Sequence, residues 1–205
     1  AIKARYPLIR KQTRNLFVSG GLELFNQNVK FGGVPLTQDK GRTGFIRADF
    51  DTFDEQSLGS INGYSAAEPK WRFGASLELR QGFDILGASE GCGPAQARCA
   101  LPSVIPVSRL EADPTAFIVR GQAYGEYRPT PEVALSLSTR AQHAADPLLS
   151  YEEMSGGAFT IGRGYDPGEV TGDSGVGVTG EIRLGSLVPE NINDTAIQGY
   201  AFADA

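Results

Sequence analysis

The most constraining feature of this sequence is a long stretch with a two-residue repeat, WRFGASLELRQGFDIL, which runs from Trp71 to Leu86. Its odd-numbered positions are mostly apolar, and its even-numbered positions carry most of its charges. Because successive side chains of a strand point to opposite faces, the stretch predicts a strand between two different environments. Strands of soluble proteins average about five or six residues, whereas a tilted strand needs about nine to eleven residues to cross a bilayer. The length therefore favours a membrane-spanning strand.

Similar alternation recurs along the whole chain, in which 26 glycines and 12 prolines separate the periodic segments. The further segments are residues 16–25, 46–51, 117–126, 133–140 and 176–184, together with the two ends near Tyr6 and Tyr200. This pattern predicts about eight strands, and no stretch has a convincing helical period.

The connections between these segments alternate in length. The short connections are residues 10–13 and 128–133, and the connection 54–70 is longer than expected for a short one. The long connections are residues 26–44, residues 87–114 and the glycine-rich stretch that ends at residue 175. Short turns on one side and long loops on the other are typical of a transmembrane barrel with an apolar outer face and a polar interior. We therefore predict an all-β, antiparallel transmembrane β-barrel. A soluble β-sandwich is the more ordinary alternative.

Composition excludes several classes of function. The 19 basic and 24 acidic residues give a net charge of -5, and the basic residues are scattered, so no nucleic-acid partner is expected. No run of about 18 apolar residues exists, so strands are the only expected route into a membrane. The chain begins at Ala1 without an initiator methionine or a leader pattern, and we expect it to be a fragment of a longer protein.

Two cysteines, Cys92 and Cys99, bracket the loop-like sequence CGPAQARC. A structural zinc site needs four ligands, and no histidine lies nearby, so no metal site is expected. We predict a local disulfide in a long surface loop and an oxidising compartment; two free thiols are the alternative.

Possible signs of an enzyme are weak. The tetrapeptide GDSG, which includes Ser174, resembles the surroundings of a serine-protease nucleophile, but His143, the single histidine, lies about thirty residues before it. That distance leaves no room for the orienting aspartate of the chymotrypsin-like order. Glu152 and Glu153 are adjacent, so on a strand they would point to opposite faces. The glycine-rich stretch does not open a helix. We predict no catalytic residues, no cofactor and no small-molecule substrate.

Residues 146–175, DPLLSYEEMSGGAFTIGRGYDPGEVTGDSG, together with the following VGVTGEIRL, resemble a specific loop. They are similar to the sixth extracellular loop of the two-partner secretion transporters, the haemolysin-activator and filamentous-haemagglutinin-transporter family of the Omp85 superfamily. The superfamily tetrad Val-Arg-Gly-Tyr/Phe stands here as Gly162, Arg163, Gly164 and Tyr165, with glycine in place of valine.

Two more segments carry the same resemblance. Residues 4–24 resemble the mid-barrel hairpin of that family, and Phe202 and Asp204 resemble the start of its inner-wall motif Phe-x-Asp-x-Gly. The resemblance implies that residues 1–205 are a partial outer-membrane barrel domain, about eight strands of a 16-stranded barrel, without its POTRA domains and its first and last strands. It also implies an open, curved sheet whose end strands do not pair.

The resemblance implies a transport function without covalent chemistry. An unfolded secreted partner protein would pass through the lumen of a barrel in the bacterial outer membrane, in contact with lipid and lipopolysaccharide, and the loop 156–175 would act as gate and anchor. We expect Arg163 to bind Asp204 inside the barrel, Gly164 to allow a tight turn, and Tyr165 to wedge its ring and anchor its hydroxyl. The alternatives are an Omp85-type assembly factor, a small structural or adhesive barrel, and a soluble β-sandwich binding module.

Overall fold

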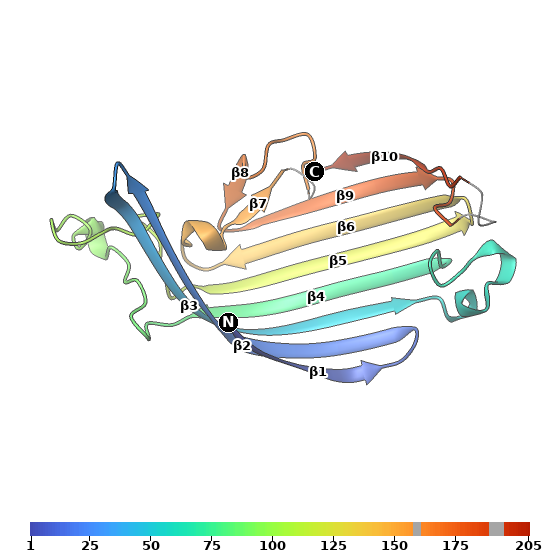
Figure 1. The fold of residues 1–205 in the computed structure, drawn as a ribbon, viewed down its shortest axis with the longest axis horizontal. Coiled ribbons are helices and arrows are strands. Elements are labelled where there is room, and N and C mark those ends of the chain that lie inside the picture. Colours follow the sequence, from blue (N-terminus) through green and yellow to red (C-terminus); the bar gives the residue numbers. More distant parts are fainter. Residues whose placement is uncertain (158–160, 189–194) are drawn as a thin grey trace.

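The computed structural model describes residues 1–157, 161–188 and 195–205 and consists almost entirely of strands (Figure 1). Eight strands form one antiparallel sheet in the order β1 (Ile2–Arg10), β2 (Arg14–Phe31), β3 (Val34–Phe53), β4 (Trp71–Gly82), β5 (Phe117–Thr130), β6 (Val133–Ala144), β9 (Gly175–Leu184) and β10 (Gly199–Asp204). A separate two-stranded ladder joins β7 (Met154–Gly156) to β8 (Val170–Gly172). Helical turns in the described ranges are short, namely η1 (Glu55–Gly59), η2 (Ile61–Gly63), η3 (Pro94–Gln96) and η4 (Ser150–Glu152). None of them is long and apolar enough to span a membrane.

The sheet is open, as predicted from the sequence. Its edge strands are β1 and β10, and the pairings described for them are with β2 and β9 respectively. Within the described residues, therefore, this chain does not close into a barrel of its own. The fold also differs from a β-sandwich, because the described part of the chain contains no second large sheet to pack against the first.

The two faces of the sheet differ from those of a soluble protein, because apolar side chains are exposed on one face and charged side chains are buried on the other. Apolar side chains such as Ile46, Leu77 and Leu137 are more than half exposed on one face, whereas the charged Arg80 and Glu126 are buried on the other. A row of large exposed apolar side chains on one face of a sheet suits a lipid environment and is unfavourable in water. The predicted alternation is therefore present, with the apolar side facing outward.

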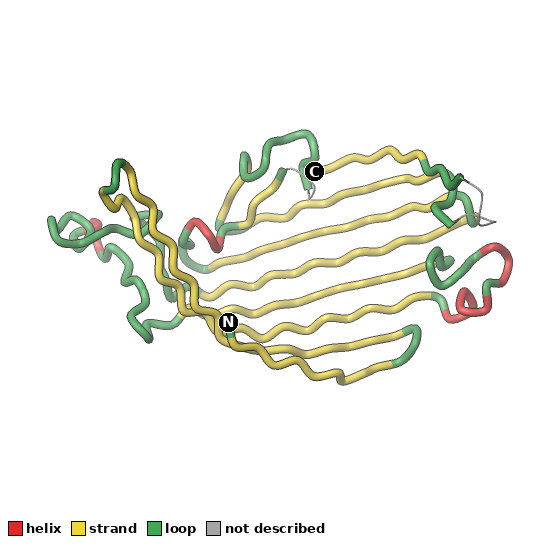
Figure 2. The backbone as a smooth tube through the Cα atoms, in the orientation of Figure 1, coloured by secondary structure: helices red, strands yellow, loops and turns green. Residues whose placement is uncertain are grey.

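The prediction of a long loop at residues 26–44 is wrong, because these residues belong to two paired strands and their turn. Strands β2 and β3, of 18 and 20 residues, remain paired as far as Phe31 and Val34. They are joined by Gly32 and Gly33, whose φ angles are +58° and +86°. Positive φ at both central residues is the geometry of a two-residue hairpin turn that matches strand twist, and glycine adopts it without strain. The hairpin bends away from the rest of the sheet (Figure 2).

Strand β4 ends at Gly82, four residues before the predicted end at Leu86. A Cβ at Gly82 would lie 2.1 Å from the carbonyl oxygen of Pro114. Pro114 and Thr115, which lead into β5, therefore lie close against the end of β4. The Phe83 amide still donates to the Arg42 carbonyl at 2.8 Å, and farther along Leu86 takes a φ of +51°.

This connection between β4 and β5 contains the two cysteines. A disulfide joins Cys92 and Cys99, whose Cα atoms are 5.0 Å apart. Cys92 is buried in a small apolar cluster with Val107, Ala112 and Leu149. Leu149 belongs to the loop that follows β6, so the disulfide-containing connection packs against that second loop.

Candidate functional site

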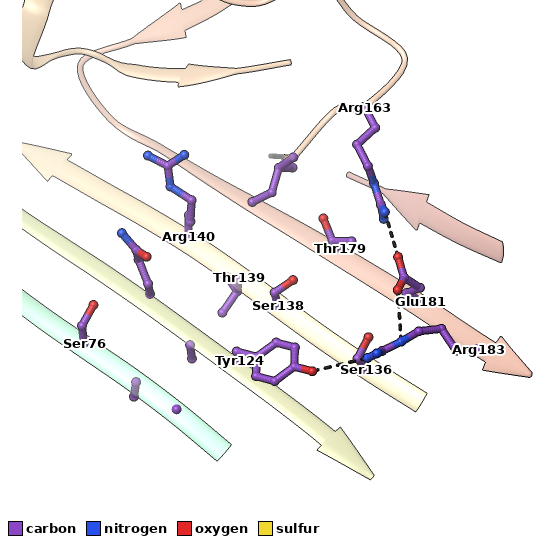
Figure 3. A pocket seen from close by; sticks show the side chains of 15 residues that line it. Ser76, Tyr124, Ser136, Ser138, Thr139, Arg140, Arg163, Thr179, Glu181 and Arg183 are labelled. Atoms are coloured by element: carbon purple, nitrogen blue, oxygen red, sulfur yellow. Dashed lines mark hydrogen bonds and ion pairs between the residues drawn. The ribbon is translucent and has the colours of Figure 1, made fainter. Parts of the chain in front are cut away.

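The loop between β6 and β9 folds back over the polar face of the sheet. It contains η4 and the β7–β8 ladder, and its tip comes close to β9 and β10 (Figure 1). Arg163 extends from the tip toward the side chains of β9, as Figure 3 shows. Residues 158–160, which belong to the predicted loop 156–175, lie outside the described residues.

The guanidinium of Arg163 is held by two carboxylates on neighbouring strands. Its Nη2 lies 3.2 Å from Oδ1 of Asp204 on β10, and its Nε lies 3.3 Å from Oδ2 of the same residue. Its Nη1 donates to Oε2 of Glu181 on β9 at 2.8 Å. The rigid fork of an arginine fits this arrangement, because its donors can reach two acceptors at once.

The Asp204 carboxylate also receives the backbone of the tip. Its Oδ2 accepts hydrogen bonds from the amides of Gly162 at 3.1 Å and Arg163 at 2.9 Å. The guanidinium carbon of Arg163 lies 3.5 Å from the ring centroid of Phe202, a cation–π contact. Hydrogen bonds to Asp204 and then to Glu181 raise the pKa of Arg163 above its ordinary value, so the side chain stays charged. Phe202 and Asp204 thus contact the same residue of the tip.

The backbone conformations of the two tetrad glycines differ from those expected. Gly162 takes a φ of +84°, a conformation that strains any β-branched residue, which explains glycine here in place of valine. Gly164 is not among the described glycines with positive φ, so the expected tight turn does not depend on it. Tyr165 is 58% exposed and, within the described residues, its hydroxyl has no hydrogen-bond partner. The expected wedge and anchor are not formed with the described residues, and this role of Tyr165 stays a prediction.

A chain of polar contacts continues from the tip along the inner face. Glu181 Oε1 lies 3.2 Å from Nε of Arg183, and Arg183 Nη2 donates to Glu126 at 2.6 Å. The Tyr124 hydroxyl lies beside Arg183 (Figure 3), and it donates to Glu126. A cavity of about 560 Å³ lies between this chain of contacts and the tip. Its lining includes Ser76, Gln122, Ser138, Arg140 and Thr179.

The profile of the protein family described as "Haemolysin secretion/activation protein ShlB/FhaC/HecB" matches residues 1–205, which is the whole sequence. The chain belongs to this family. The resemblance inferred from the loop after β6, from residues 4–24 and from the last six residues is thereby confirmed at the level of the family.

A solved structure supports the fold of this ShlB/FhaC/HecB family member. CdiB from Escherichia coli superposes with a TM-score of 0.66 and 15% sequence identity. The match covers 89% of this chain and 30% of CdiB, so the chain spans less than a third of that protein. No curated protein sequence matches the chain.

The protease-like tetrapeptide forms a contact that the sequence did not predict. Ser174 Oγ lies 3.4 Å from Nδ1 of His143, because the two residues extend the pairing of β9 with β6. Ser174 Oγ also accepts the amide of Ala144 at 3.0 Å. The neighbouring Asp173 instead accepts from Arg109 and from the amide of Leu148 at 2.9 Å. No carboxylate among the described residues forms an ion pair with His143, so the third member of a triad is missing there.

Sequence reasoning missed the second carboxylate of the site, Glu181. A usable signal was present, because Thr179, Glu181 and Arg183 alternate along one strand and so share its polar face. The sequence alone does not specify that this row lies next to Asp204 or that the tip comes down between them. As to metals, the described residues contain no group of three or more His, Cys, Asp or Glu side chains that could hold an ion.

Proposed function

We propose that this chain forms part of the pore of a bacterial outer-membrane transporter that secretes a partner protein, with the loop between β6 and β9 folded into the lumen as anchor and gate. The polar face of the sheet would line the lumen, and the exposed apolar face would contact lipid and lipopolysaccharide. The partner would pass through unfolded, and no catalytic residue, cofactor or small-molecule substrate is required. This is the two-partner, or type Vb, mode of secretion.

The observation that carries the proposal is the attachment of the loop tip to the inner face. Arg163 reaches two carboxylates on β9 and β10, and the exposed fractions of the three side chains are 21% for Arg163, 19% for Glu181 and 8% for Asp204. Separating such a pair leaves a charge partly out of water. A loop tip held in this way occupies the lumen at rest and is released when its ion pairs break. Membership of the ShlB/FhaC/HecB family supports the secretion function.

The test is secretion by the full-length transporter together with its partner protein. Arg163→Ala and Asp204→Ala remove the anchor, whereas Arg98→Ala removes an arginine that pairs with Glu90 in the connection between β4 and β5, outside the cavity below the tip. We expect secretion to fall about tenfold or more for the first two variants, since an effect of about 1.4 kcal/mol suffices, and to stay unchanged for the third. Each variant is compared at equal amounts of heat-modifiable, folded barrel.

Other results would point elsewhere. Normal secretion by Arg163→Ala and Asp204→Ala would remove the anchor from the proposed mechanism. If the wild-type transporter instead promoted insertion of other barrels and released no partner, it would be an assembly factor of the same superfamily. A chain that behaves as a monomer in buffer without detergent would contradict the membrane location altogether.

A further inference from the structure

The structure attaches the same loop to the sheet at a second place, nearer its base. Glu152, in η4, is buried, and its carboxylate lies between two arginines of the inner face. Its Oε1 accepts from Nη2 of Arg80 on β4 at 2.9 Å, and its Oε2 accepts from Nη2 of Arg120 on β5 at 2.6 Å. Its main-chain carbonyl accepts from Arg120 and from Gln142 on β6, both at 2.9 Å. Glu152 is thus bonded to strands β4, β5 and β6, and the Thr43 hydroxyl of β3 lies 3.5 Å from its Oε1.

The neighbouring side chains fit closely against the sheet. The Tyr151 ring stacks on Phe25 of β2 with centroids 4.0 Å apart. A Cβ on Gly41 of β3 would lie 1.6 Å from the Tyr151 hydroxyl oxygen, so the ring occupies space that only a glycine leaves free. Burial raises the pKa of Tyr151 to about 12, and the phenol stays neutral. Leu148 is buried against Ile118.

The returning limb of the loop is tied at the same level. Asp173 accepts from Arg109, and it accepts from the Leu148 amide at 2.9 Å, which links the two limbs to each other. The Gln142 side chain donates to the Asp173 carbonyl at 3.1 Å while it also holds Glu152. The loop base, which we define as residues 148–153 and 173–174, is therefore fixed on both sides.

Between base and tip, the described residues of the loop form a narrow two-stranded ladder. The β7–β8 ladder pairs only three residues on each side. A cavity of about 360 Å³ lies beside it, lined by Met154, Tyr165, Val170 and Val176 among others. Gly157, next to the ladder, takes a φ of +102°, which favours glycine. The loop tip, residues 161–169, is thus separated from the base by a short hairpin next to a cavity.

We propose that the loop base is a fixed part of the pore and that only the tip moves, with Glu152 as the residue that positions the base. The proposal rests on the secretion function proposed above. Movement of the tip alone would open the lumen beside β6, β9 and β10, where the cavity lined by Ser138 and Thr179 already lies. The lumen beside β3, β4 and β5 would stay filled by the base. The passing polypeptide would then meet one side of the pore wall.

Two buried threonines give matched reporters for this division. Thr43 is 6% exposed and lies beside Glu152, to which its hydroxyl donates at 3.5 Å, whereas Thr179 is 8% exposed and lies below the tip (Figure 3). In the purified full-length transporter, Thr43→Cys and Thr179→Cys would be labelled with a fluorescent maleimide while the native disulfide stays intact. Labelling needs no secretion, so it can succeed or fail independently of the proposed function.

Each reporter is combined with loss of one anchor. We expect Glu152→Ala to speed the labelling of Thr43→Cys about tenfold and to change the labelling of Thr179→Cys by no more than about twofold. We expect Arg163→Ala to speed the labelling of Thr179→Cys and to leave that of Thr43→Cys nearly unchanged, because each substitution opens a separate local unit. Glu152→Gln keeps the size and part of the hydrogen bonding and should lie between wild type and alanine. If Glu152→Ala speeds both reporters equally, or neither, the division into base and tip is overturned.

Cross-links then test which part must move. Ile161→Cys/Gly177→Cys would tie the tip to β9, since a Cβ on Gly177 lies 3.3 Å from that of Ile161. His143→Cys/Ser174→Cys would tie the base to β6, since the two residues continue the strand pairing. We expect the tip cross-link to reduce secretion about tenfold or more, reversibly with reductant, and the base cross-link to leave it within about twofold. Loss of secretion from the base cross-link would overturn the proposal, whereas a wild type that does not secrete would overturn the proposed function instead.

Discussion

The tip and the base of one loop are attached to the same face of the sheet by the same chemistry, arginine with carboxylate, but with opposite polarity. At the tip the loop supplies the arginine, Arg163, and the strands supply Asp204 and Glu181. At the base the loop supplies the carboxylate, Glu152, and the strands supply Arg80 and Arg120. The loop base would bring a carboxylate to the carboxylates of the tip site, and the loop tip would bring an arginine to the arginines of the base site. The charges therefore fix the orientation of the loop on the sheet.

The two attachments differ in how deeply they are buried. At the base, Glu152 and Arg80 are each 8% exposed, although Arg120 is 27% exposed. At the tip, Arg163 is 21% exposed, and its partners Glu181 and Asp204 are 19% and 8% exposed. Water that reaches an ion pair weakens it and lowers the cost of separating it. The Glu152–Arg80 pair, in which both side chains are buried, therefore distinguishes the base, and we expect it to be harder to separate than either ion pair of the tip.

The largest expected effect comes from closing the space that Tyr151 occupies. Gly41→Ala places a methyl group within 1.6 Å of the Tyr151 hydroxyl, and the ring cannot yield easily because it is stacked on Phe25. We expect the base to leave the sheet, with a loss of about 1 to 3 kcal/mol in the stability of the folded transporter. Denaturant unfolding in detergent measures the loss.

A matched substitution at the tip is Gly177→Ala, whose methyl group would meet the Ile161 side chain at 2.8 Å. That side chain can rotate away, so the change should cost clearly less than Gly41→Ala. Equal losses for the two variants would contradict a rigid base and a loose tip.

The next effect concerns the shape of the cation at the tip. Arg163→Lys keeps the charge, but one ammonium group cannot reach both carboxylates while its stem stacks on Phe202 as the guanidinium does. We expect this variant to retain a part of the anchoring and to secrete at a level between wild type and Arg163→Ala. Glu181→Gln, which keeps an acceptor for Arg163, should be milder than Asp204→Asn, because Asp204 also accepts the two tip amides. Secretion assays at equal barrel amounts rank the four variants, and a lysine variant equal to wild type would show that charge alone suffices.

The sequence allowed the sheet to be predicted better than the loop. Strict alternation in β4, β5, β6 and β9 specifies which side chains share a face, because a strand has an exact period of two. The hairpin of β2 and β3 does not follow from the same reasoning: a long connection is expected at residues 26–44, whereas Gly32 and Gly33 form a two-residue turn between paired strands.

The tip of the loop could be predicted from a motif, and the base could not. Arg163 and Asp204 each stand in a short pattern typical of the family, which is why their contact was expected. Glu152 stands in no such pattern, and its partners Arg80 and Arg120 are 72 and 32 residues away along the chain. Contacts of this kind depend on how the whole loop packs on the sheet, for example on the space left at Gly41, and one sequence does not encode that in any local signal.

A smaller effect is expected from the disulfide, which acts on the base alone. Cys92 packs in the cluster that includes Leu149 of the base, while no residue of the tip belongs to that cluster as described. Replacing both cysteines by serine should cost the connection between β4 and β5 about 2 kcal/mol, the usual value for a short loop. We expect faster maleimide labelling of Thr43→Cys and unchanged labelling of Thr179→Cys in this variant. An equal increase at both positions would mean that the disulfide supports the whole loop.

The smallest expected effect is a dependence on pH at the base of the loop. The hydrogen bond from Arg109, followed by that from the Leu148 amide, holds the pKa of Asp173 below its ordinary value of about 3.9. A carboxylate with a lowered pKa in the folded protein contributes stability above its ordinary pKa and loses that contribution as the pH falls through its folded pKa. The contribution should be at most about 1 kcal/mol, because the pair is partly exposed to solvent.

Melting temperatures of the detergent-solubilised transporter, compared between wild type and Asp173→Asn, should therefore differ at pH 7 and converge as the pH falls below about 3.9. Glu111→Gln is the control, since Glu111 binds the same arginine but is 54% exposed, and it should leave the pH dependence intact. A difference between wild type and Asp173→Asn that stays constant from pH 7 to the lowest pH at which the barrel survives would mean that Asp173 acts through packing, and the base would then owe its fixed position to Glu152 and Tyr151 alone.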